Sequence, residues 1–331
     1  MAVTMADISK LRQMTGAGMM DCKKALAEAN NDIDAAIEIL RKKGQAVAAK
    51  REDRNASEGC VIAQSTGDYA AVVALNCETD FVGKNEGFVN LTKAILAAAV
   101  AAKAKSADEV KALVIDGQTV ADRIVEESGK TGEKMELGSF EYVEGPATIA
   151  YNHFGNKLAT LVSFNKAGLD EQVYKNVAMQ VAAMNPIAVD ECDVAEEIKE
   201  KEIAVAIEKT KAEQVQKAVE AALKKAGINP AHVDSEDHME SNKAKGWITQ
   251  EDVDKAKEII ATVSAEKAAN LPEAMIQNIA KGRLGKFLKE VCLLNQEDVT
   301  GEDKKTVRET LKAIDAELSV IAFKRVNLNV D

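Results

Sequence analysis

The chain has 331 residues, a formal net charge of -11, 46% hydrophobic residues and only 4% aromatic residues. At about 100–200 residues per domain, this length predicts two or three domains, and the apolar content is sufficient to build their cores. The acidic balance argues against a nucleic-acid-binding protein, which needs a basic surface to neutralise phosphates, but it leaves a protein partner open.

The five cysteines are scattered and form no CxxC motif and no pairing with histidine. This pattern indicates reduced thiols, without a disulfide framework or a zinc site. Asp7, Lys10 and Arg12 leave no apolar segment for a signal peptide near the N-terminus. The longest apolar run, 94–102, is shorter than the roughly 20 residues that span a bilayer. We therefore expect a cytoplasmic chain without a membrane anchor or a cofactor.

Residues 4–54 predict a small unit of three helices. Apolar residues recur at helical spacing over 8–14, 19–29 and 33–40, the glycines of 15–18 break the first helix, and Gly44 is a candidate C-terminal cap. Successive helical residues face different ways, so Met19 and Met20 cannot both point into so small a core. Either one of them is exposed as an adaptable contact, or both fill gaps in the core.

A basic run follows these helices, between Lys42 and Arg54. The interpretation that we favour is a solvated linker face. The alternative is a patch that binds RNA, which the acidic surroundings weaken.

Residues 58–102 and 146–185 follow one plan. In each, a strand, a tight turn and a second strand are followed by a helix, with turns at 66–68 and 153–156 and helices at 88–102 and 173–184. An open hairpin with a helix on one face leaves an edge and an apolar surface. The two halves are therefore expected to pair.

The first hairpin ends in the segment NCETDFVGKN, residues 76–85, which joins a buried strand at 69–75 to the following helix. Here Asp80 and Phe81 stand side by side at a corner, where a scaffold can present side chains to a partner. A lone aromatic residue is usually part of a core. The alternative is therefore that Phe81 packs with Phe88, seven residues later, to hold the helix start in place.

The rest of the chain is mostly helical in pattern. Helices are expected at 110–114, 120–125, 274–291 and 306–314, a loop at 128–133, and a final strand at 318–328. A weak apolar heptad over 191–226, a break at 227–230 and apolar residues over 253–263 predict a helical hairpin. Gly129-Lys130-Thr131 is similar to the end of a phosphate-binding loop, but the upstream glycine and strand are missing, so we reject a nucleotide site.

Two long motifs, MTGAGMMDCKKAL at 14–26 and NCETDFVGKN at 76–85, resemble the bacterial elongation factor Ts family, and YNHFGNK at 151–157 resembles a further family motif. Members of this family are guanine-nucleotide exchange factors of the GTPase elongation factor Tu. The resemblance implies an α+β fold. It comprises a ubiquitin-associated-like three-helix domain (1–54) that docks on the GTPase, two pseudo-repeated core subdomains with antiparallel sheets (55–145; 146–190 with 271–331), and a protruding coiled-coil hairpin (191–270).

The resemblance also implies roles for particular residues. Four would dislodge Mg²⁺ in the GTPase: Thr79, Asp80, Phe81 and Val82. Five would bind the partner: Leu11, Met19, Met20, His153 and Gly155. The alternative for His153 is an exposed turn residue without a role. The family often carries a C-terminal helical module, to which we assign no contact.

No constellation for covalent catalysis is recognisable in the sequence, so an enzyme is not expected. Two other functions stay open. One is a passive adaptor that binds a partner without driving exchange. The other is an RNA-binding protein that uses the 42–54 run, whose binding would fall steeply with salt.

Overall fold

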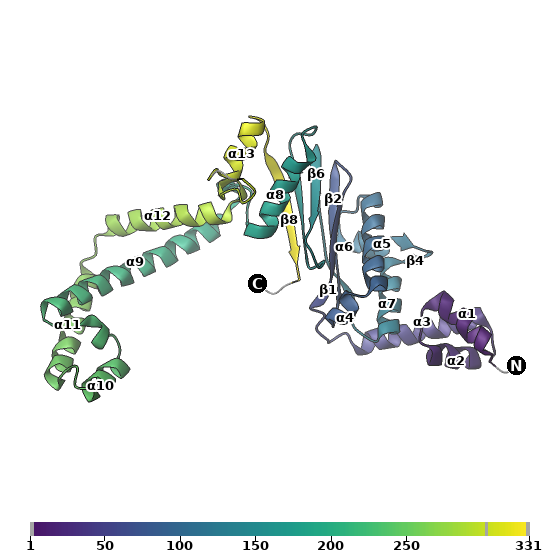
Figure 1. Ribbon diagram of the computed structural model, residues 1–331, viewed down its shortest axis with the longest axis horizontal. Coiled ribbons are helices and arrows are strands. Elements are labelled where there is room, and N and C mark those ends of the chain that lie inside the picture. The colour runs from purple at the N-terminus through teal and green to yellow at the C-terminus, as the bar shows by residue number, and fades with distance from the viewer. Residues whose placement is uncertain (1–2, 302–303, 329–331) are drawn as a thin grey trace. The chain divides into compact units, whose positions relative to one another are not determined.

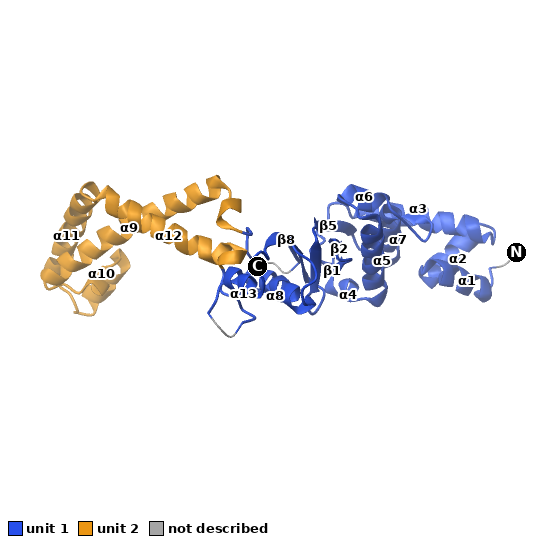
Figure 2. Cartoon of the chain, turned by 90° about the horizontal axis from the view of Figure 1, so that it is seen from above, with its two compact units in different colours: residues 1–189, 296–331 blue, residues 190–295 orange. Residues whose placement is uncertain are grey.

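The computed structural model describes residues 3–301 and 304–328, and the chain divides into two compact units (Figure 2). Unit 1 comprises residues 1–189 and 296–331, and unit 2 comprises 190–295. Helices and small antiparallel sheets occur together, which confirms the α+β prediction. Among the described helices, none has the length and apolarity needed to cross a membrane.

Unit 1 begins with α1 (Met5–Thr15), α2 (Met19–Glu28) and α3 (Ile33–Lys50). They enclose a small core that includes Ile8, Leu11, Cys22 and Leu26. The prediction that Gly44 caps the third helix is wrong, since α3 continues to Lys50. The glycine instead allows a close crossing with α7: a Cβ placed on Gly129 would lie 2.3 Å from the Gly44 Cα.

The first sheet has the order β1-β2-β5 and is antiparallel throughout. It contains β1 (Glu58–Ser65), β2 (Tyr69–Cys77) and β5 (Met135–Glu144), and β5 was not predicted. Between β2 and β5 the chain forms α4 (Asp80–Gly83), α5 (Glu86–Ala102), α6 (Ala107–Ala112), β3 (Val114–Ile115), β4 (Gln118–Thr119) and α7 (Val120–Thr131). The loop expected at 128–133 is wrong for residues 128–131, because α7 continues to Thr131 and is capped by Gly132.

The second sheet has the order β6-β7-β8, formed by β6 (Ala147–Asn152), β7 (Leu158–Phe164) and β8 (Val320–Asn327). The final strand was predicted and is confirmed. This half also contains α8 (Glu171–Met184) and α13 (Val307–Ile314). As in the first half, a hairpin and a helix are completed by a strand from much later in the chain.

The two sheets pack face to face between α5 and α8 (Figure 1). Val61 and Val72 meet Leu161 and Val326 between the sheets, whereas Val73 and Leu75 face the other way and pack in the same cluster as Ile95 of α5. Strand β2 is therefore buried on both faces, which explains why its sequence is almost continuously apolar.

Unit 2 is helical in all its regular elements: η1 (Glu191–Asp193), α9 (Glu196–Lys225), η2 (Pro230–His232), α10 (Glu236–Ala244), α11 (Gln250–Ala269), α12 (Glu273–Val291) and η3 (Leu293–Asn295). The long helix α9 packs against both α11 and α12. The unit therefore extends to residue 295, beyond the 270 suggested by the sequence, because the return arm consists of two helices instead of one. At the α9–α11 end, Leu223, Ile228, Met239 and Val253 form a separate small core.

Candidate functional site

The corner after β2 presents Phe81 to solvent. Thr79 caps the one-turn helix α4, its hydroxyl accepting a long hydrogen bond of 3.5 Å from the Val82 N–H, and Asn85 then caps α5. Because Lys84 and Asn85 separate the two helices, Phe81 and Phe88 do not share a helical face. Phe88 is buried, whereas 85% of Phe81 is exposed. The interpretation that Phe81 packs into the core is therefore wrong.

Two contacts hold α4 against the sheet. Val82 is half-buried and packs on the core beneath α5. Gly83 lies directly on β1, where an added Cβ would come within 2.9 Å of the Gly59 carbonyl oxygen. Gly59 itself has φ +151, and a Cβ there would lie 2.1 Å from the Leu75 carbonyl oxygen. The backbones approach so closely that α4 cannot shift freely.

Asp80 lies beside Phe81 and is charged. Its carboxylate accepts a 2.6 Å hydrogen bond from the Lys84 ammonium, and this bond lowers the pKa of Asp80. Because this hydrogen bond outweighs the opposing effect of partial burial, the carboxylate stays ionised at neutral pH.

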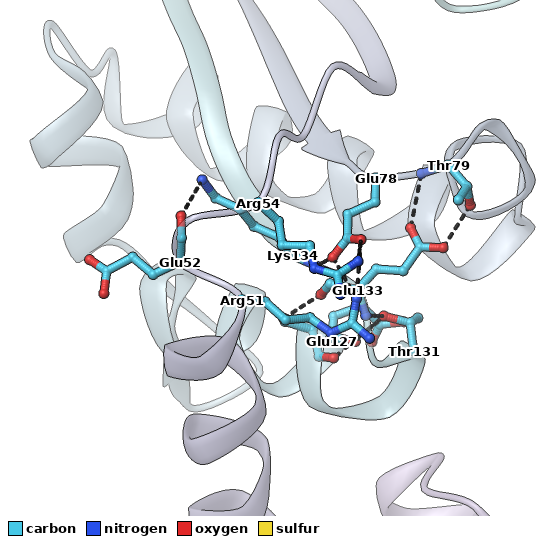
Figure 3. A network of polar contacts seen from close by, with 10 residues as sticks. Arg51, Glu52, Arg54, Glu78, Thr79, Glu127, Thr131, Glu133 and Lys134 are labelled. Carbon is cyan, nitrogen blue, oxygen red and sulfur yellow. Dashed lines mark hydrogen bonds and ion pairs between the residues drawn. The ribbon is translucent and has the colours of Figure 1, made fainter.

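A polar network, here called the Glu78–Glu133 network, fixes the two residues before α4 (Figure 3). Glu133, between α7 and β5, accepts hydrogen bonds from the Thr79 N–H at 3.1 Å and the Thr79 hydroxyl at 2.6 Å. Glu78 accepts from the Lys134 N–H at 2.7 Å and from the Arg51 guanidinium at 2.8 Å. The Lys134 N–H and then Arg51 lower the pKa of Glu78.

This network was not predicted from the sequence. Arg51 and Arg54 belong to the basic run that we interpreted as a linker, and both pair with Glu78, Arg54 at 3.4 Å. The single carboxylate offsets one of these two positive charges and holds Arg51 in place, which weakens the RNA-patch alternative. The only signal in the sequence was the basic run itself, which gave no indication of its acidic partner.

The candidate contacts of the N-terminal helices divide into exposed and buried residues. Met19 is 49% exposed and Met20 is 63% exposed, so the alternative that both fill gaps in the core is wrong. Leu11 is fully buried. It can support the methionine surface by packing but cannot itself touch a partner.

His153 and Gly155 are exposed in the turn between β6 and β7. Gly155 has φ +89, a conformation that favours glycine. The His153 Nδ1 lies 3.0 Å from the Tyr151 hydroxyl, which orients the ring. Phe154 lies between the two candidates and projects from the same turn.

The described residues give little support for a metal site, a reactive thiol or a phosphate-binding loop. In the described part of the chain, no group of three or more His, Cys, Asp or Glu side chains could hold a metal ion. Burial raises the pKa of the Cys77 thiol to about 12 and that of Cys60 to about 11, so both remain protonated. Lys130, from the segment similar to a phosphate loop, lies in α7 and pairs with Glu126 at 2.9 Å.

Comparison with known proteins supplies the family. The protein-family model described as Elongation factor TS matches residues 78–329 of this chain. Proteins named Elongation factor Ts are 71% identical to this chain in Bacteroides thetaiotaomicron, 68% in Parabacteroides distasonis and 43% in Porphyromonas gingivalis. In each case the similarity covers all of both chains.

Proposed function

Since the chain belongs to the elongation factor Ts family, we propose that it is the guanine-nucleotide exchange factor of elongation factor Tu. It binds the GDP form of that GTPase and promotes release of GDP, so that GTP can load. The observation that carries this proposal is Phe81, an exposed aromatic side chain on a short helix held rigidly against a sheet. The role requires no covalent step and no cofactor, and the cytoplasm, where translation takes place, is the matching compartment.

The exchange follows from linkage between two binding events. A partner that binds the nucleotide-free GTPase more tightly than the GDP form weakens GDP binding by the same factor. Phe81 enters between side chains of the GTPase as a wedge, and Asp80 supports the distortion that dislodges Mg²⁺. Loss of this ion removes the charge that neutralises the GDP phosphates. Thr79 caps α4 and Val82 packs on the core, and these two contacts hold Asp80 and Phe81 in position.

Two further surfaces hold the GTPase. Met19 and Met20 form an adaptable apolar surface on the N-terminal domain, residues 1–54, and Leu11 supports it from within the core. His153 and Gly155 bind at a place away from the nucleotide. All these residues belong to unit 1, and no nucleic-acid contact is needed.

Release of fluorescent GDP from elongation factor Tu tests the proposal. The intact protein should accelerate release when present in substoichiometric amount. Truncation of a central interface aromatic residue costs about 2 kcal/mol or more, so Phe81→Ala should slow accelerated release by about 30-fold. The fold should be preserved, because the side chain is exposed.

The matched control is Trp247→Ala, which removes an exposed aromatic side chain from unit 2 and should leave release unchanged. A normal release rate with Phe81→Ala would remove Phe81 from the mechanism. Binding to the GTPase without any acceleration by the intact protein would indicate a passive adaptor.

A further inference from the structure

Phe154 is 97% exposed, although it lies in a well-fixed turn. The His153 N–H donates to the Leu158 carbonyl at 2.9 Å, and the Asn156 N–H donates to the His153 carbonyl at 3.3 Å. Gly155 and Asn156 both take positive φ. The closed turn therefore presents Phe154 to solvent with little backbone freedom, which reduces the entropy lost when a partner covers the ring.

This turn and α4 both contact the start of β1. On one side, Gly83 of α4 packs on Gly59. On the other, the Val61 N–H donates to the Asn156 carbonyl at 2.8 Å, and the Lys157 ammonium pairs with the Glu58 carboxylate. Residues 81–83 and 156–157 therefore border the same few residues of one strand. Phe81 and Phe154 lie at the same end of the sheets.

The charges between the two aromatic residues are paired with one another. Asp80 pairs with Lys84, and Glu58 pairs with Lys157. The two pairs also interact electrostatically. Lys84 is the main cause of the lowered pKa of Asp80, and the positive charge of Lys157 lowers it further. The surface between the rings thus carries two acids and two bases, and a partner can cover it without meeting an excess of either sign.

We propose that Phe154 is a second apolar anchor for the GTPase, on a surface continuous with Phe81 through the Asp80–Lys84 and Glu58–Lys157 pairs. The inference rests on the proposed function. It goes beyond the family resemblance, which points to His153 and Gly155 but not to the phenylalanine between them. The occupant is an apolar pocket of the same GTPase, because the second ring borders the surface that the first one uses.

The two anchors have different roles. Phe81 acts on the nucleotide site, so its effect lies in the rate of GDP release from the complex. Phe154 is separated from Phe81 by the start of β1 and holds the complex together regardless of the nucleotide. Two anchors on one rigid surface bind at high effective concentration, since engagement of one places the other.

Titration of GDP release against factor concentration separates the roles, because it gives both a half-saturating concentration and a maximal rate. Phe154→Ala should raise the half-saturating concentration about 10- to 100-fold, the range for truncation of an aromatic anchor, with a maximal rate within about twofold of the original. Phe154→Leu should recover part of the affinity because it keeps an apolar side chain. Trp247→Ala should match the unaltered protein in both quantities.

An unchanged half-saturating concentration with Phe154→Ala would overturn the proposal, and so would a reduced maximal rate with unchanged affinity. Neither result would affect the exchange function, which depends on Phe81. If the intact protein fails to accelerate release, the exchange function fails instead. Calorimetric binding of the nucleotide-free GTPase to intact protein and to Phe154→Ala then tests the anchor by itself, and equal affinities would reject it.

Discussion

At the residue scale, the position of the exposed Phe81 depends on two carboxylates, Glu78 and Glu133, that are hydrogen-bonded within the protein. Glu78 precedes Thr79 and connects two distant segments of the chain. It accepts hydrogen bonds from Arg51, which follows α3, and from the Lys134 N–H, which precedes β5. Only 13% of its side chain is exposed. A charged hydrogen bond in such a place is stronger than one between neutral groups, and it fixes geometry as well as adding stability.

Glu78 should make the unfolding free energy of unit 1 depend on pH. Its folded pKa lies below the usual value of 4.5, chiefly because the Lys134 N–H and Arg51 favour the ionised form. A depressed pKa stabilises the fold above the unfolded value, and this contribution is lost as pH falls through the folded pKa. Glu78→Gln should therefore lower the urea unfolding free energy at about pH 6 and have a smaller effect at about pH 3.

The control for this prediction is Glu136→Gln. Glu136 lies in β5, and its carboxylate forms an ion pair with the Lys134 ammonium. The Glu136 side chain is 46% exposed, and an ion pair with so exposed a partner contributes little, so the effect of this change should be small at both pH values. A penalty for Glu78→Gln that stays constant across this pH range would show that the carboxylate charge is not what matters.

At the scale of elements, the crossing of α3 and α7 joins the N-terminal helices to the core. Here Gly44 and Gly129 bring two backbones together. Helix propensity alone would favour alanine at position 129, by about 1 kcal/mol. The added Cβ would lie 2.3 Å from the Gly44 Cα, however, so α3 would have to move away.

Gly129→Ala should therefore lower the unfolding free energy, by about 1–3 kcal/mol for overpacking at a buried contact. It should also weaken binding of the GTPase, since the methionine surface on α2 would no longer be fixed relative to Phe81. Gly282→Ala is the matched control: it lies within α12, and its Cβ would meet nothing within 4 Å. That change should stabilise the protein slightly. Equal stabilisation by both changes in urea unfolding would contradict the proposed role of the crossing.

The elements also show what could be predicted from the sequence. Both hairpins were predicted because their turn residues and apolar strands are local signals. Strand β5 was missed because most of its residues are half-buried or exposed and its partner β2 is distant in the chain. The end of α7 was misplaced because Gly129 reads as a helix breaker, whereas here it permits close packing. The contacts of Glu78 and Glu133 join residues far apart in the chain, which no periodicity reveals.

At the scale of the whole molecule, every residue assigned a role in exchange lies in unit 1, whereas unit 2 has helices and a core of its own. The two ends of unit 2 are close together: the Asn295 side-chain amide donates to the Glu191 carboxylate at 2.8 Å. A short segment can therefore replace the unit without stretching the chain. A flexible linker of about six residues is long enough for this purpose.

Replacement of residues 191–295 by such a linker should leave GDP release nearly as fast at saturation, within about threefold, because Phe81 and its supporting network are untouched. Circular dichroism should show the loss of helix while the sheets remain. A large drop in the maximal rate, with the sheets intact, would mean that unit 2 takes part in exchange. A rise in the half-saturating concentration alone would instead place unit 2 in binding, and the wedge would still account for the release step.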